Sequence, residues 1–127
     1  MNGVGIIAVA LGASTGALLR FSLGILLNPI FPTIPLGTLA ANLTGGYLMG
    51  IFMGLMVNPV FFTDTAKLII ATGFLGGLTT FSTFSAETVY LIQTGQYVWM
   101  MVIILCHVVG SILATILGIY TVKLITS

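Results

Sequence analysis

The chain has 127 residues, of which 58% are hydrophobic and only 4% are charged. A soluble domain carries about 25% charged residues, so this composition excludes a soluble enzyme with a large pocket and a nucleic-acid-binding protein. It predicts an integral membrane protein that forms one domain over residues 1–127, with the lipid bilayer around most of its surface.

Four apolar segments are each long enough to cross a hydrocarbon core of about 30 Å as an α-helix. The start of the chain lacks the basic stretch of a signal peptide, so we expect the first segment to be retained. An even number of crossings places both termini on the same side of the membrane. The predicted all-α fold has helices at roughly residues 3–27, 36–57, 66–93 and 98–124.

The few charged residues give little guidance on orientation. Lys67 and Lys123 fall on the side of the termini, whereas Arg20 lies near the opposite end of the first segment. A two-to-one distribution of basic residues fits either insertion under the positive-inside rule. If both orientations occur, an antiparallel homodimer becomes possible.

Small residues recur at a spacing of four along three of the segments. Such stripes let helix backbones approach closely in lipid, so we expect them to pack helices within a subunit or between subunits. The stripes are Ala8, Gly12 and Gly16, then Gly46, Gly50 and Gly54, and finally Gly110, Ala114 and Gly118.

The third segment is interrupted where an unbroken helix would be expected. Residues 73–85 contain three glycines, paired threonines and two serines, and these residue types are poor in helix interiors. Gly76 lies ten residues after Ala66, or about 15 Å at the helical rise, which is the middle of the bilayer. Unpaired backbone at that depth is tolerated where it lines a cavity or binds an ion. We therefore predict a break at residues 76–80 and a candidate site around it.

Groups of both signs would meet at this break. The half-helix that follows it offers unpaired N–H groups and its positive dipole end, while carbonyls that end the preceding half-helix suit a hard cation such as Na⁺. Phe81 and Phe84 follow the break. Their ring edges carry weak positive charge that could face an anion, although ordinary packing in lipid explains them equally simply.

Other polar residues lie deep in the second and fourth segments. Asn42 is costly at mid-membrane unless it is hydrogen-bonded, and either an interhelical hydrogen bond or a donor facing an ion path explains it. His107, Ser111 and Thr115 are spaced four apart and form one polar line across the bilayer centre. Each hydroxyl could instead bond to its own helix backbone, and His107 fits a structural role better than a proton relay.

Two charged residues flank these groups. Arg20 lies near the end of the first segment and can extend its side chain to the interface. Glu87 lies seven residues after Thr80, which is about 10 Å from the midplane by helical rise. We expect both residues to be structural or to line a vestibule.

Three motifs together resemble one known family. Residues 76–85, Gly-Gly-Leu-Thr-Thr-Phe-Ser-Thr-Phe-Ser, resemble the signature of the Fluc (CrcB) fluoride channels. Residues 37–42, Gly-Thr-Leu-Ala-Ala-Asn, are similar to the family's second-helix motif, and the stretch from Gly12 to Arg20 resembles its first-helix motif. The resemblance extends over all four segments in order.

This resemblance implies a passive, fluoride-selective channel that exports fluoride across the bacterial inner membrane and lowers its toxicity. The implied fold is an antiparallel, dual-topology homodimer of four-helix subunits with two antiparallel pores. A structural Na⁺ at the dimer interface would be held by backbone carbonyls of Gly76 and Thr79. The implied pore residues are Asn42, Phe81, Ser82, Thr83, Phe84, Ser111 and Thr115, with Arg20, Glu87 and His107 as vestibule candidates.

Other functions fit the residues less well. A small dual-topology, proton-coupled multidrug transporter would share the length and the four helices, but it needs a titratable carboxylate deep in the membrane. The first segment has no Asp or Glu, and Glu87 lies away from the midplane. A purely structural or assembly protein would not require a helix broken at mid-membrane. We do not expect an enzyme, because the sequence suggests no metal-ligand cluster and no nucleophile–base pair.

Overall fold

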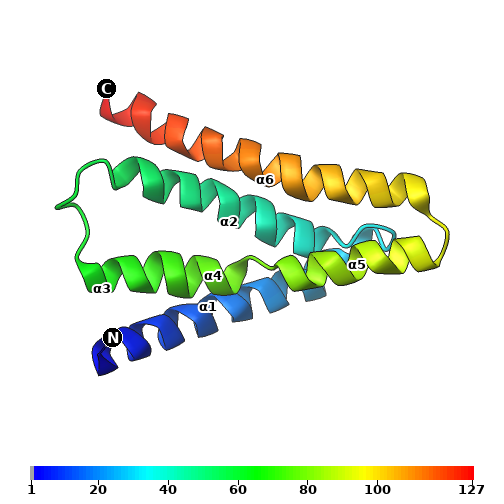
Figure 1. Ribbon diagram of the computed structural model, residues 1–127, viewed down its shortest axis with the longest axis horizontal. Helices are drawn as coiled ribbons and strands as arrows, with labels where there is room; N and C mark the ends of the chain where they lie inside the picture. The colour runs from blue at the N-terminus through cyan, green and yellow to red at the C-terminus, as the bar shows by residue number, and fades with distance from the viewer. Residues whose placement is uncertain (1) are drawn as a thin grey trace.

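The computed structural model describes residues 2–127 and is all-helical over that range (Figure 1). Four helical spans are long and apolar enough to cross a membrane, at Gly3–Ile30, Leu36–Leu55, Asp64–Gln93 and Tyr97–Thr126. Both termini lie at the same end of the bundle (Figure 1). The predicted all-α architecture with four membrane crossings is thus confirmed.

The first two spans form a hairpin. Helix α1 covers Gly3–Leu27, and the short 3₁₀ helix η1 (Asn28–Ile30) leads into a proline-containing loop before α2 (Leu36–Leu55). The Asn28 side chain accepts a hydrogen bond from the Gly37 N–H at 2.8 Å. This contact ties the end of α1 to the start of α2.

The third span consists of several pieces. It begins with α3 (Asp64–Lys67), continues as the π-helix η2 (Leu68–Leu75), and ends its first half with the short α4 (Gly76–Leu78). Thr79 and Thr80 are extended, and α5 (Phe81–Gln93) then forms the second half. The observed break is therefore narrower than the predicted residues 76–80, because Gly76 and Gly77 remain helical.

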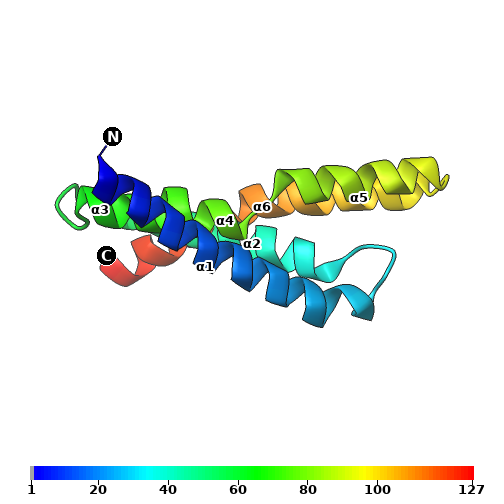
Figure 2. The same ribbon diagram turned by 90° about the horizontal axis from the view of Figure 1, so that it is seen from below.

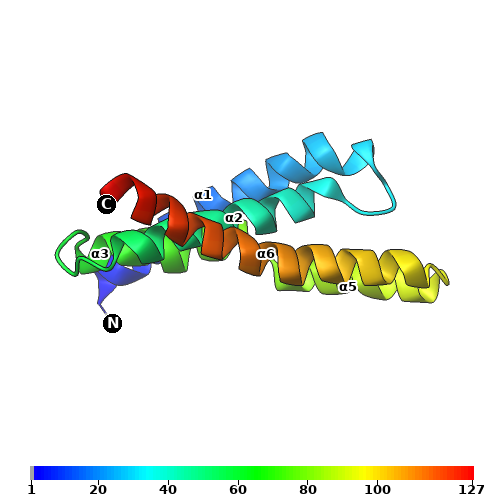
Figure 3. The ribbon, with the colours of Figure 1, turned by 90° about the horizontal axis from the view of Figure 1, so that it is seen from above.

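The two halves of the third span have different neighbours. The first half lies along α1, whereas α5 lies along α6 (Tyr97–Thr126). In the views from below and above, the pair of α5 and α6 diverges from the pair of α1 and α2 (Figures 2 and 3). A core of buried side chains joins α5 to its neighbours. Its members are Ile34, Phe84, Leu91 and Ile103.

The predicted small-residue stripes pack helices within the chain. An added Cβ at Gly12 on α1 would lie 2.5 Å from the Ile69 carbonyl oxygen on η2. On α2 an added Cβ at Gly50 would overlap the Thr115 carbonyl oxygen, and at Gly118 on α6 it would overlap the Tyr47 carbonyl oxygen. Close backbone contact of this kind is how small residues pack helices in lipid.

Candidate functional site

A cavity of about 490 Å³ lies where α2, α6 and the break in the third span meet. No Lys, Arg, Asp or Glu is among the described residues that line it. The cavity brings together most of the residues that the sequence singled out. These are Asn42, Gly76, Thr79, Phe81, Phe84, His107, Ser111 and Thr115.

Side chains take up two N–H groups at the break, whereas the Thr79 N–H keeps its bond to the Leu75 carbonyl. The Thr80 N–H donates to Oδ1 of Asn42 at 2.7 Å, and the Thr83 N–H donates to Oγ1 of Thr80 at 3.1 Å. In a continuous α-helix these two N–H groups would donate to the carbonyls of Gly76 and Thr79. The same two carbonyls are therefore released from the helical pattern.

The carbonyl of Gly77, one of the two between them, has a side-chain partner. Nε of Arg20 donates to the Gly77 oxygen at 3.1 Å, so a cationic side chain from α1 caps the end of the first half-helix. A positive group is favourable at a helix C-terminus. Gly76 and Thr79, in contrast, both line the central cavity. Their donor set of uncharged backbone oxygens suits Na⁺, so these residues fit the cation that the family resemblance implies.

Asn42 uses its whole amide in the wall of the cavity. Besides accepting from the Thr80 N–H, it donates from Nδ2 to the Thr80 carbonyl at 3.0 Å. Nδ2 also lies 2.9 Å from Nδ1 of His107. Asn42 thus links α2, the break and α6, and this is the interhelical bonding that the sequence left open as one of two explanations.

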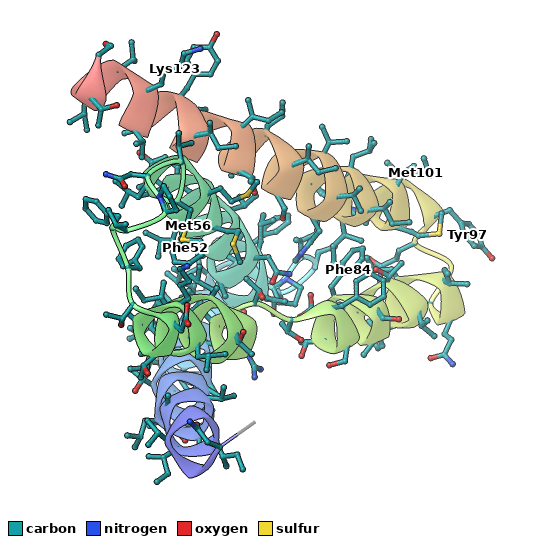
Figure 4. All side chains as sticks on the ribbon, turned by 60° about the vertical axis from the view of Figure 1, so that its left-hand side comes forward. Phe52, Met56, Phe84, Tyr97, Met101 and Lys123 are labelled. Carbon is teal, nitrogen blue, oxygen red and sulfur yellow. The ribbon has the colours of Figure 1, made fainter. Side chains whose placement is uncertain are left out.

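The two phenylalanines differ in their surroundings. The Phe81 side chain is 76% exposed, whereas that of Phe84 is only 7% exposed. Their rings meet edge to face with centroids 5.6 Å apart. Phe84 also stacks on the His107 ring at 4.6 Å, and it lies on the side of α5 that faces α6 (Figure 4). Phe81 is thus open to the cavity mouth and Phe84 forms part of the wall.

The hydroxyls on α6 are not equivalent. Oγ1 of Thr115 lies 2.9 and 3.0 Å from the carbonyl oxygens of Gly46 and Ser111, which share its one hydrogen. The Ser111 hydroxyl makes no hydrogen bond within residues 2–127, and it lines the central cavity. Ser111 is therefore the hydroxyl with free bonding capacity.

The remaining predicted residues lie outside the central cavity. Arg20 and Thr83 line a second cavity of about 320 Å³ on the α1 side of the break. The Ser82 hydroxyl is 3.3 Å from Oγ1 of Thr80 and is exposed. Oε2 of Glu87 accepts from the Thr38 hydroxyl at 2.6 Å, and Glu87 lines a third cavity of about 240 Å³ beside the proline-containing loop.

Two residues at these sites were missed by the sequence analysis. Thr80 holds Asn42 and caps α5, and a threonine directly before a helix is a typical N-cap signal. Thr38 is buried and pairs with Glu87. Its position four residues before Asn42, on the same helix face, could have identified it.

Four spans and a helix broken beside an uncharged, donor-lined cavity define the class: an integral membrane protein with a candidate ion path. The sequence profile described as CrcB-like protein, Camphor Resistance (CrcB), matches residues 7–119, and the chain belongs to this family.

Named relatives match nearly the whole chain. It is 58% identical over 116 residues to the fluoride-specific ion channel FluC of Nitrosospira multiformis, a match that covers 91% of each protein. It is 53% identical over 112 residues to the protein of that name from Aromatoleum aromaticum, covering 88% of this chain and 86% of the relative. The corresponding Tolumonas auensis protein is 49% identical over 120 residues, 94% of each protein.

Proposed function

We propose that this chain is a fluoride-selective, passive ion channel of the bacterial inner membrane that exports fluoride from the cytoplasm. One observation carries the proposal: hydroxyl and N–H donors gather with aromatic rings beside a helix break, in a cavity whose lining, over residues 2–127, includes no Lys, Arg, Asp or Glu. The relatives named as fluoride-specific ion channels, at 49–58% identity, support the same assignment.

The chemistry of the cavity suits a small, strongly hydrated anion. Fluoride needs several donors to replace its hydration shell, and a narrow path excludes larger halides. Hydroxyls, an amide and ring edges supply partial positive charge without a fixed cation. Rapid conduction requires sites that bind weakly enough to release the ion, so the absence of lysine and arginine from the cavity lining fits a channel.

Each predicted pore residue has a distinct role in this proposal. Ser111 offers its free hydroxyl, while Thr115 and Asn42 would have to exchange an existing hydrogen bond for one to the ion. Phe81 and Phe84 present ring edges. His107 lies in the wall of the central cavity beside Phe84, while a further set of residues (Ser82, Thr83, Arg20 and Glu87) would act at the entrances to the path.

We propose that the working unit is an antiparallel, dual-topology homodimer with two pores. The carbonyls of Gly76 and Thr79 are only two oxygens, fewer than a dehydrated cation requires, so a second copy would complete a Na⁺ site at the two-fold axis. A bound Na⁺ would supply positive charge near the path. Exchange of Na⁺ for a large organic cation should then weaken assembly, as measured by the dimer fraction on gel filtration.

The proton-coupled multidrug transporter is the weaker candidate. Such coupling needs a carboxylate where the substrate passes. Glu87 instead lines a separate small cavity and accepts a hydrogen bond from Thr38, and none of the described residues that line the central cavity is a carboxylate.

Anion efflux from proteoliposomes tests the function directly. Purified protein would be reconstituted with internal KF and KCl, valinomycin would be added to carry K⁺, and two electrodes would follow fluoride and chloride together. We expect rapid fluoride release and no chloride release. Equal release of both anions would contradict selectivity, and drug-dependent proton flux without fluoride release would favour the transporter.

A further inference from the structure

We propose that Asn42 is a positioning residue that fixes the tautomer of His107, so that the Nε2–H of the ring is held as a ready donor beside the ion path. The use of this donor for an anion rests on the function proposed above. The tautomer itself does not, and it can be measured independently.

The backbone of the break fixes the orientation of the Asn42 amide. The Thr80 N–H can only donate, and it lies 2.7 Å from Oδ1. The Thr80 carbonyl can only accept, and it lies 3.0 Å from Nδ2. A flipped amide would set donor against donor and acceptor against acceptor, which identifies the nitrogen without ambiguity.

The amide in turn fixes the proton on the histidine. Nδ2 of Asn42 can only donate, and its second hydrogen is directed at Nδ1 of His107, 2.9 Å away. Nδ1 must therefore be an unprotonated acceptor. A neutral imidazole carries its single proton on the other nitrogen, so the ring is in the Nε2–H form.

That Nε2–H has no partner. The His107 side chain is 4% exposed, and Nε2 is fully buried without a hydrogen bond among the described residues. Phe84 stacks on the ring. A buried donor without an acceptor is costly. The hydrogen bond from Asn42 to Nδ1 keeps the ring in the Nε2–H form despite this cost. Because Nε2 is fully buried, an anion next to Phe84 reaches it only when neighbouring side chains shift, and it then gains a desolvated donor without displacing an existing bond.

The arrangement also couples two parts of the site. Asn42 takes the Thr80 N–H that would otherwise satisfy the Gly76 carbonyl, and the same amide holds the His107 proton. One side chain therefore prepares both the released carbonyl at the break and the donor on α6.

The chain has a single histidine, which makes the tautomer directly measurable. Histidine labelled with ¹⁵N would be incorporated and the protein reconstituted in bilayers at neutral pH. Solid-state NMR should find Nδ1 unprotonated and Nε2 protonated in the wild type. An Nδ1–H tautomer or a doubly protonated ring would overturn the inference. In Asn42→Ala the ring should show a mixture of tautomers, and an unchanged spectrum would remove Asn42 from the positioning role.

Two substitutions of the histidine separate its nitrogens in the flux assay. Glutamine places an amide N–H near the position of Nε2, whereas asparagine reaches only the position of Nδ1. We expect His107→Gln to keep most of the fluoride flux and His107→Asn to lose about tenfold or more, the effect of one lost hydrogen bond to an ion. Thr121→Val, which removes a hydroxyl on α6 outside the cavity, is the matched control and should conduct normally.

The outcomes distinguish the two proposals. Equal flux in His107→Gln and His107→Asn would overturn the donor role while leaving the channel function intact. If the wild type released no fluoride, the proposed function would fail, and the ¹⁵N spectrum would still decide whether Asn42 sets the tautomer.

Discussion

The two halves of the third span are held in place by opposite means. The first half, residues 64–78, meets α1 backbone to backbone through glycines on both sides, such as Gly12 against Gly73. The second half, α5, rests on α6 through large side chains, Phe84 and Leu91 against Ile103. The half-helix before the break is thus positioned by close backbone contact with α1. The half-helix after the break, which carries the phenylalanines, is positioned by the packing of large side chains. The first half should fail when atoms are added, and the second when a ring is removed.

The largest effect is expected from adding one methyl group to the first half. In Gly12→Ala the new Cβ would meet the Ile69 carbonyl oxygen at 2.5 Å and the Phe74 nitrogen at 2.9 Å. Backbone cannot move aside as a flexible side chain can, so we expect more than the usual overpacking cost of about 1–3 kcal/mol. Thermal unfolding in detergent should show a strong loss of stability and of the folded fraction.

A glycine elsewhere on the same helix provides the control. An added Cβ at Gly24 would lie 3.4 Å from the Asn28 side-chain nitrogen, a contact that a small shift can relieve. Gly24→Ala should therefore unfold close to the wild type. Equal stability of Gly12→Ala and the wild type would show that the first half is not held by close glycine packing.

A smaller and more selective effect is expected when the rings are replaced on the second half. Phe81→Ile and Phe84→Ile keep apolar bulk but remove the ring edges, and each should lower fluoride flux by about tenfold or more, equivalent to about 1.4 kcal/mol. Phe81 is mostly exposed, so its variant should keep wild-type stability. Phe84→Ile should also lose its stacking on His107 and unfold slightly earlier.

The flux assay and the dimer fraction should be measured on the same samples. Wild-type flux in both variants would reject the role of the ring edges. Lost flux with lost dimer would instead assign the phenylalanines to assembly.

The sequence predicted the two sides of this comparison unequally. Four spans, the small-residue stripes and a break in the third span follow from composition and spacing, which act locally. The limits of the break do not. Gly76 and Gly77 are poor helix formers, yet they are helical in the structure, where Gly77 packs directly against the Ala13 backbone on α1. The π-helix of residues 68–75 was likewise not predicted, because apolar composition and length do not distinguish a π-helix from an α-helix.

The polar contacts of the site were beyond local prediction for a related reason. Asn42 bonds to Thr80, which is 38 positions away, and approaches His107, which is 65 positions away. A spacing pattern can show that a polar residue lies deep in a helix, but the choice of partner depends on how the helices cross. Asn42 was therefore recognised as important, while its bonding to the break was found only in the fold.

The smallest of these effects is expected at the contact that joins the two sides of the break. Arg20 on α1 caps the first half-helix at the Gly77 carbonyl and also faces the cavity that contains Thr83 at the start of α5. Replacing Arg20 with methionine removes one partly buried hydrogen bond and should cost about 1 kcal/mol of stability or less, with less than a tenfold loss of fluoride flux. Lysine keeps the charge but lacks the Nε–H that bonds to Gly77. If capping is the main role, Arg20→Lys should resemble Arg20→Met in thermal unfolding. Lysine can also donate from Nζ, so recovery of both stability and flux by lysine would show that any cationic donor suffices here and that the Nε–H of arginine is not required.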